Sequence, residues 1–246
     1  MQCARYTVFT RETAIKEYFQ QGVVNRIPGD TDVFVAAPKR QAEFEYGKER
    51  LIEEARIVAK FQSPSIVRVD DFFEENGTSY MVMEFLDYET MEGFLIHQKR
   101  PLTEDEAVNI GVWLCEALDE IHHAGVIHRD ISPDNIFVGK DGSVKIIDFG
   151  SARLSKEDTD SRLIVLKPGY APPEQYEKID PENDLQQAWT DIYALGATTL
   201  STDPEPGNLN GFPALSIFLK GFGVIDFFIV LQDSELNLQN IHPNYL

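Results

Sequence analysis

The sequence predicts an α+β fold in which a smaller, strand-rich part is followed by a larger, mostly helical part. Short alternating or apolar runs predict strands at 6–9, 13–19, 66–73 and 79–86, and one long helix at 42–61 lies among them. Beyond residue 86 the clearest periodic segment is helical and opens at Thr103. A chain of 246 residues is long enough for one large domain or two small lobes.

The first two predicted strands form a hairpin, because only the polar Thr10-Arg11-Glu12 separates them. The helix at 42–61 carries an apolar stripe of Leu51, Ala55 and Val58, and Glu54 falls inside this stripe while Glu53 faces water. A carboxylate in a buried stripe needs a cation or hydrogen-bond donors. The alternative is that Glu54 only borders the stripe.

The next two strands flank a turn at Glu75-Asn76-Gly77-Thr78, and a capping box at Thr103–Glu106 opens a helix that runs to Gly125. The residues of this helix expected to face the core are Val108, Val112, Cys115, Leu118 and Ile121. His122 and His123 near its end point apart, so we interpret them as residues favoured by the helix dipole and not as a metal pair.

Composition excludes several classes of partner. The net charge of −19 argues against nucleic acid or an anionic membrane and favours a basic protein substrate. Cys3 and Cys115 have neither disulfide-framework nor zinc-site spacing, which makes a reducing cytoplasm the default. No signal peptide is visible, and the apolar stretch 214–231 contains Lys220 and Asp226, which favours a soluble segment. The oligomeric state stays open.

Two motifs carry the chemistry of the chain. The first is His128-Arg129-Asp130-Ile131-Ser132-Pro133-Asp134-Asn135, and Asp148-Phe149-Gly150 begins thirteen residues after it. Apolar runs at 126–127 and 144–147 predict buried strands that end just before each motif. Two carboxylates and an amide that converge at strand ends suit a site that holds Mg²⁺ and accepts a proton from a hydroxyl. This combination indicates phosphoryl transfer.

With both motifs at this spacing, the chain resembles a eukaryotic-type (Hanks-type) bacterial serine/threonine protein kinase. The resemblance implies a two-lobed kinase fold, with a partial N-lobe at 1–86 and a C-lobe at 87–199. It implies transfer of the ATP γ-phosphate to a protein Ser/Thr hydroxyl, with ATP and Mg²⁺ as cofactors. It assigns the catalytic base to Asp130, the Mg²⁺ ligands to Asn135 and Asp148, and an anchor of the activation segment to Arg129.

The resemblance also supplies a nucleotide site. Lys16 would hold the α- and β-phosphates and pair with Glu54, although a strand lysine is more often simply solvated. Met83 would flank the back of the adenine pocket, and backbone groups of Glu84 and Leu86 would pair with the adenine edge. The residues at 79–86 are equally compatible with an ordinary buried strand that binds no nucleotide.

The activation segment would run from Asp148 to Glu174, with Ser155, Thr159 and Ser161 as candidate phosphorylation sites and Arg129 as the partner of a phosphate. In the helix that includes 189–196, Asp191 would brace the catalytic loop. Ser132 stands where the family usually has lysine, and Lys167 stands where it usually has threonine. We therefore predict that Lys167 hydrogen-bonds Ser132 and returns the missing cation to the γ-phosphate.

Two departures from the family support another interpretation. No glycine precedes Lys16, so the glycine-rich loop and the first strand are expected to be missing. After Thr199 the resemblance ends, and 200–246 is a divergent tail with no late helices and no arginine to pair with Glu174. The alternatives are an inactive pseudokinase or fragment that acts as a binding module, and a small-molecule phosphotransferase of related fold.

Overall fold

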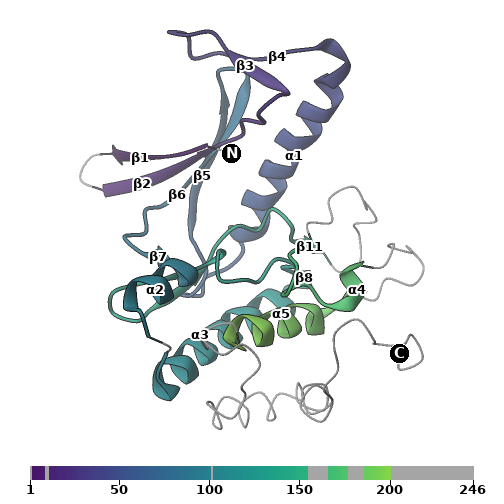
Figure 1. Cartoon of the computed structure of the whole chain (residues 1–246). Coiled ribbons are helices and arrows are strands. Elements are labelled where there is room, and N and C mark those ends of the chain that lie inside the picture. The colour runs from purple at the N-terminus through teal and green to yellow at the C-terminus, as the bar shows by residue number, and fades with distance from the viewer. Residues whose placement is uncertain (1, 9–10, 101, 155–165, 177–185, 201–246) are drawn as a thin grey trace.

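The computed structural model describes residues 2–8, 11–100, 102–154, 166–176 and 186–200. They form two lobes, one rich in strands and one mostly helical (Figure 1), which confirms the predicted α+β architecture. The small lobe contains β1 (Gln2–Val8), β2 (Arg11–Glu17), β3 (Val24–Arg26), β4 (Val33–Val35), a 3₁₀ turn (Pro38–Arg40), α1 (Gln41–Val58), β5 (Val69–Glu75) and β6 (Thr78–Glu84).

The larger lobe alternates short strands with longer helices. Its elements are β7 (Glu89–Thr90), α2 (Met91–Gln98), α3 (Glu104–His123), β8 (Val126–Ile127), β9 (Ile136–Val138), β10 (Val144–Ile146), β11 (Arg153–Leu154), α4 (Pro173–Tyr176) and α5 (Ala188–Leu200). Helices α3 and α5 lie side by side beneath the strands that carry the two motifs (Figure 1).

The sheet of the small lobe is antiparallel, with the strand order β1-β2-β6-β5 among the described residues. The predicted β1–β2 hairpin is present and places Ala4 opposite Ile15. Asn76 and Gly77 link β5 to β6 with positive φ values of 52° and 72°, as a tight hairpin turn requires. A Cβ on Gly77 would lie 2.6 Å from the Val33 carbonyl oxygen, so this position needs glycine for close approach as well as for its φ.

Helix α1 buries one face against this sheet. Leu51, Ala55 and Val58 are buried as predicted, and so is Glu54, whereas Glu53 is exposed. The N-lobe core consists of Tyr18, Val23, Val24, Val33, Phe44, Leu51, Ala55 and Met81. Val58, near the end of α1, belongs instead to the core of the larger lobe. Helix α1 therefore packs in both lobes.

Helix α3 is the centre of the larger core. The predicted capping box is present, with Thr103 accepting from the Glu106 N–H and Glu106 reaching back to the N-cap. Cys115, Leu118 and Ile121 are buried as predicted, while Val108 and Val112 are only partly buried. Their places on the core face are taken by Ala107, Ile110, Leu114 and Ala117.

Several short elements were not predicted. Strands β3 and β4 pair with each other between β2 and α1, and each has only three residues, too few for an alternating pattern to stand out. Among the described residues no helix is long and apolar enough to cross a membrane. The stretch 214–231 and the predicted tail after residue 200 lie outside the described residues.

Candidate active site

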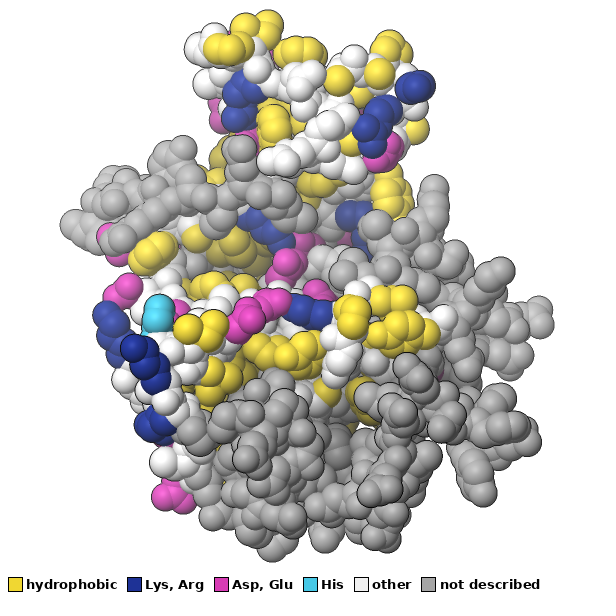
Figure 2. All heavy atoms as spheres, viewed as in Figure 1, with side chains coloured by type: hydrophobic (Ala, Val, Ile, Leu, Met, Phe, Trp, Pro, Cys, Tyr) yellow, Lys and Arg dark blue, Asp and Glu magenta, His cyan; other side chains and the backbone are white. Residues whose placement is uncertain are grey.

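The two motifs occupy the loops that follow β8 and β10 and lie where the lobes meet. In the space-filling view, acidic and basic side chains gather next to one another across this middle band (Figure 2). Arg129 and Asp148 have φ values of 66° and 60°, a left-handed conformation that costs an L-residue on the order of 1 kcal/mol or more. Such backbone persists only where surrounding contacts hold it.

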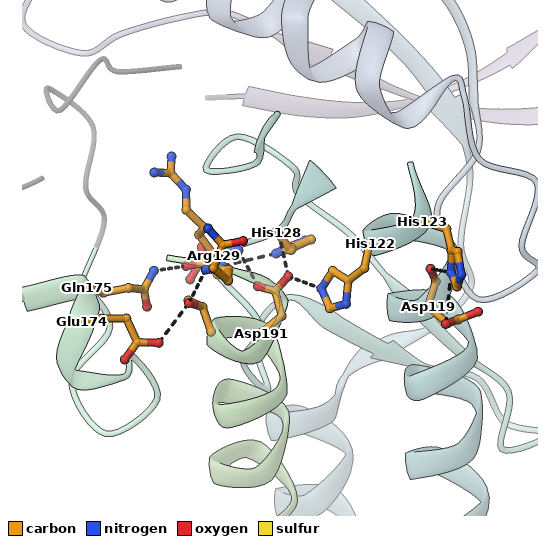
Figure 3. A network of polar contacts seen from close by, with 11 residues as sticks. Asp119, His122, His123, His128, Arg129, Glu174, Gln175 and Asp191 are labelled. Carbon is orange, nitrogen blue, oxygen red and sulfur yellow. Dashed lines mark hydrogen bonds and ion pairs between the residues drawn. The ribbon is translucent and has the colours of Figure 1, made fainter. Parts of the chain in front are cut away.

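Asp191 on α5 provides those contacts for the first loop (Figure 3). Its Oδ2 accepts hydrogen bonds from the His128 backbone N–H at 2.8 Å, and its Oδ1 accepts from the Arg129 N–H at 2.7 Å. His122 Nε2 lies 2.8 Å from Oδ2, whereas His123 turns the other way and contacts Asp119. The predicted brace is therefore present, and the two histidines point apart.

Arginines hold the residues that follow Asp148 through their carbonyl groups. Arg129 Nε donates to the Ser151 carbonyl oxygen at 2.6 Å, and Arg50 on α1 donates to the carbonyls of Gly150 and Ala152 at 3.3 and 3.4 Å. Gln175 Nε2 in turn donates to the Arg129 carbonyl at 2.9 Å. The candidate phosphorylation sites at 155, 159 and 161 lie outside the described residues.

The two carboxylate oxygens of Asp130 differ in their contacts within the described residues. Asn135 Nδ2 donates to both Oδ2 and the backbone carbonyl of Asp130 at 2.8 Å. The other oxygen, Oδ1, is buried and has no hydrogen-bond partner among the described residues. Burial raises the pKa of Asp130 above its ordinary value, against the opposing effects of His128 and Asn135. Such an oxygen can accept a proton from an incoming hydroxyl.

Lys16 joins the two lobes at this site. Its Nζ lies 2.6 Å from Glu54 Oε1 on α1 and 3.1 Å from Asp148 Oδ1. Burial acts to lower the pKa of Lys16, but the two carboxylates outweigh it and raise the pKa, so the amine stays charged. The predicted Lys16–Glu54 pair is present.

Asp148 remains accessible despite these contacts, because 46% of its side chain is exposed. Partial burial acts to raise the pKa of its carboxyl, but the charge of Lys16 and a hydrogen bond from the Gly150 N–H outweigh it and lower the pKa. Asp148 is therefore an ionised, reachable carboxylate, which is what a Mg²⁺ ligand requires.

Lys167 contacts the loop at 128–135 through two of its side chains. Its Nζ donates to Ser132 Oγ at 2.8 Å and forms an ion pair with Asp134 Oδ2. The predicted hydrogen bond to Ser132 is present, while the role of Lys167 toward a phosphate stays a prediction. The ion pair with Asp134 was not anticipated, because only the fold brings residues 134 and 167 together.

The end of β6 carries the predicted adenine-binding residues. Met83 packs against both cores, and Leu86 packs against the larger one. The Glu84 side chain pairs with Lys145 Nζ at 2.8 Å and accepts from the Arg68 N–H, while the Glu84 N–H donates to the Arg68 carbonyl at 3.1 Å. Pairing of the Glu84 and Leu86 backbone with adenine stays a prediction.

Glu174 has a different partner from the arginine expected of the family. Its Oε1 accepts a hydrogen bond from Thr190 Oγ1 at 3.0 Å, and Thr190 directly precedes Asp191 on α5. The Gln187 N–H also donates to this hydroxyl at 3.2 Å. Threonine therefore links α4 to the helix that braces the catalytic loop.

Comparison with known proteins gives one consistent result. The sequence model described as the protein kinase domain matches residues 21–202. A probable serine/threonine-protein kinase PknB of Lactococcus lactis is 31% identical over 95% of the chain, and so extends past the predicted limit at Thr199. A probable serine/threonine-protein kinase of Clostridium perfringens is 32% identical over 86% of the chain.

The chain spans about a third of the length of these curated relatives, 36% and 29% respectively. A solved structure titled PpkA-294 apo form superposes with a TM-score of 0.66 and 34% identity, over 80% of this chain and 68% of that one. The matched residues include the catalytic loop, the Asp148 motif and the brace on α5. The chain belongs to the protein kinase family.

Proposed function

We propose that this chain is the catalytic part of a serine/threonine protein kinase that transfers the γ-phosphate of ATP to a protein hydroxyl. The observation that carries the proposal is the buried Oδ1 of Asp130, which has no hydrogen-bond partner in the described part of the chain, on a loop that also presents Asn135. The names of the relatives from Lactococcus lactis and Clostridium perfringens support the reaction class.

The residues present fit Mg²⁺ and ATP. Asp148 and Asn135 offer a carboxylate and an amide oxygen, and Mg²⁺ is commonly held by one or two such groups together with phosphate oxygens. When bound, the ion would neutralise charge on the phosphates. Lys16, held by Glu54, would place a second positive charge against them.

Asp130 would orient the acceptor hydroxyl and take its proton as the hydroxyl oxygen bonds to the γ-phosphorus, while the bond from that phosphorus to the bridging oxygen breaks and ADP leaves. Asn135 holds Asp130 Oδ2, so that Oδ1 is the oxygen left for this task. Lys167 would supply positive charge at the transferred phosphate from the opposite wall, and Ser132 Oγ would help to hold it there. Met83 would flank the back of the adenine pocket, and backbone groups of Glu84 and Leu86 would pair with the adenine edge.

The expected acceptor is a basic protein, because the chain carries a net charge of −19. A reducing cytoplasm is the compartment that the cysteine usage favours. A second candidate function is an inactive module that binds a partner without phosphate transfer. The observation that favours it is that Ser132 stands where the family's catalytic loop usually has lysine.

Calorimetric titration with Mg-ATP distinguishes the two functions. We expect the wild-type chain to bind, Asp148→Asn to lose Mg-dependent binding, and Asp119→Asn, an exposed change on α3, to bind as wild type does. Radiolabelled transfer to a basic protein should then depend on Asp130. Binding with no transfer, or with transfer unchanged in Asp130→Asn, would exclude the proposed catalytic role.

A further inference from the structure

The ammonium group of Lys167 lies between two acceptors of the catalytic loop. Ser132, a fully buried neutral hydroxyl, accepts one hydrogen bond from it. Asp134, two residues further on and 47% exposed, forms the ion pair. A lysine side chain has four carbons and about 2 kcal/mol of rotamer entropy to lose, so a neutral hydroxyl alone fixes its charged end weakly.

Asp134 is itself held by a third side chain. Glu92, in the first turn of α2, shares a hydrogen bond with Asp134. The Asp134 carboxylate therefore lies between Glu92 on α2 and the Lys167 ammonium, with which it forms the ion pair.

The N-terminal turn of helix α2 fixes the position of Glu92. Thr90 caps the helix by accepting from the Gly93 N–H at 3.1 Å, which sets the first turn from which Glu92 extends. On the other side, Ser132, whose Oγ accepts from Lys167 at 2.8 Å, lies two residues from Asp130 on the same loop. Lys167 is therefore close enough to the proposed catalytic base for its position to matter.

We propose that Asp134 is a positioning residue, which holds the Lys167 ammonium beside Asp130 and the reacting phosphate. The inference rests on the proposed function, in which Lys167 supplies positive charge to the transferred phosphate. Groups that stabilise a transition state are effective when they are already in place before the reaction. Asp134 does not touch the phosphate or the acceptor hydroxyl, and acts only through Lys167.

A double-mutant cycle tests this dependence. We expect Asp134→Asn to lower kcat about tenfold with little change in KM for the protein substrate, and Lys167→Met to lower kcat about a hundredfold. The double variant should be no slower than Lys167→Met alone, because Asp134 then has nothing to position. Asp119→Asn is the exposed control. Multiplied losses, or a change in KM for a basic substrate alone, would overturn the inference and assign Asp134 to substrate recognition.

A second measurement does not depend on activity. Pulsed acetylation followed by mass spectrometry reports how readily each lysine reacts, and an ammonium paired with a carboxylate must leave it and lose its proton first. We expect Asp134→Asn to speed acetylation of Lys167 severalfold relative to Lys140, whose side chain is 89% exposed. Equal rates overturn the inference, whereas faster labelling in a chain without phosphate transfer contradicts only the proposed function.

Discussion

Replacing Asp191 with asparagine tests how the catalytic loop is held. The carboxylate is fully buried and accepts from the N–H groups of His128 and Arg129, with His122 as a third neighbour. Asparagine has nearly the same shape, but one of its two positions is an amide that donates. One of the two backbone N–H groups must then face another donor with no water to replace the lost acceptor.

The expected loss follows from these contacts. A hydrogen bond to a charged group contributes about 1.5–3 kcal/mol, and a buried donor left without a partner costs about 1–3 kcal/mol. Together they give a loss of about 3–5 kcal/mol in unfolding free energy. For a domain of this size that is a fall in Tm of about 6–20 °C. The left-handed Arg129 backbone loses its support at the same time.

Thermal unfolding followed by circular dichroism measures the effect. Asp119→Asn is the matched control, because this aspartate is 71% exposed and lies on neighbouring α3 in the same network (Figure 3). Its Tm should stay within about 2 °C of the wild type. If Asp191→Asn also changed Tm by no more than about 2 °C, the brace would not determine the conformation of the loop.

Three further changes have definite expected outcomes. Asp130→Asn should abolish phosphate transfer yet raise Tm at neutral pH, because burial raises the pKa of Asp130 and the ionised carboxylate destabilises the folded chain. In thermal melts at a series of pH values, this increase in Tm should shrink as pH falls and disappear below the ordinary aspartate pKa. Lys16→Met should lower the unfolding free energy by about 3–5 kcal/mol, because it removes the cation that pairs with the buried Glu54 carboxylate. Adding Glu54→Leu should recover most of the lost Tm, and a double variant that melts no higher than Lys16→Met would contradict this. Lys145→Met should leave the Glu84 carboxylate with only the Arg68 N–H among its described partners, lower Tm and speed hydrogen–deuterium exchange at residues 84–86. Unchanged exchange would show that the ion pair does not stiffen this segment.

The part of the site that could be predicted follows from patterns within short stretches. Glu54 stood out because a carboxylate within an apolar helical stripe needs a partner, and Lys16 is that partner at 2.6 Å. Asp130, Asn135 and Asp148 were found because their motifs have fixed spacing. The hydrogen bond between Ser132 and Lys167 could be predicted because both residues differ from those that the family usually has at these positions.

The remaining contacts depend on tertiary geometry. Asp134 lies inside the motif at 128–135, but no local pattern predicts its ion pair, because its partner Lys167 is 33 residues away. Glu84 was expected to present its backbone to adenine, and no local pattern indicates that its side chain pairs with Lys145 on β10. Strands β3, β4, β7 and β11 have two or three residues each, so pairing alone defines them.

The brace from Asp191 also sets an order of events during synthesis of the chain. Arg129 leaves the ribosome 62 residues before Asp191, and its N–H has no carboxylate to bond until α5 has formed and packed against α3. The small lobe and α3 involve more local contacts and can form earlier. We therefore expect a nascent chain that ends at α4 to contain every motif residue of the catalytic loop while the loop still lacks its active conformation.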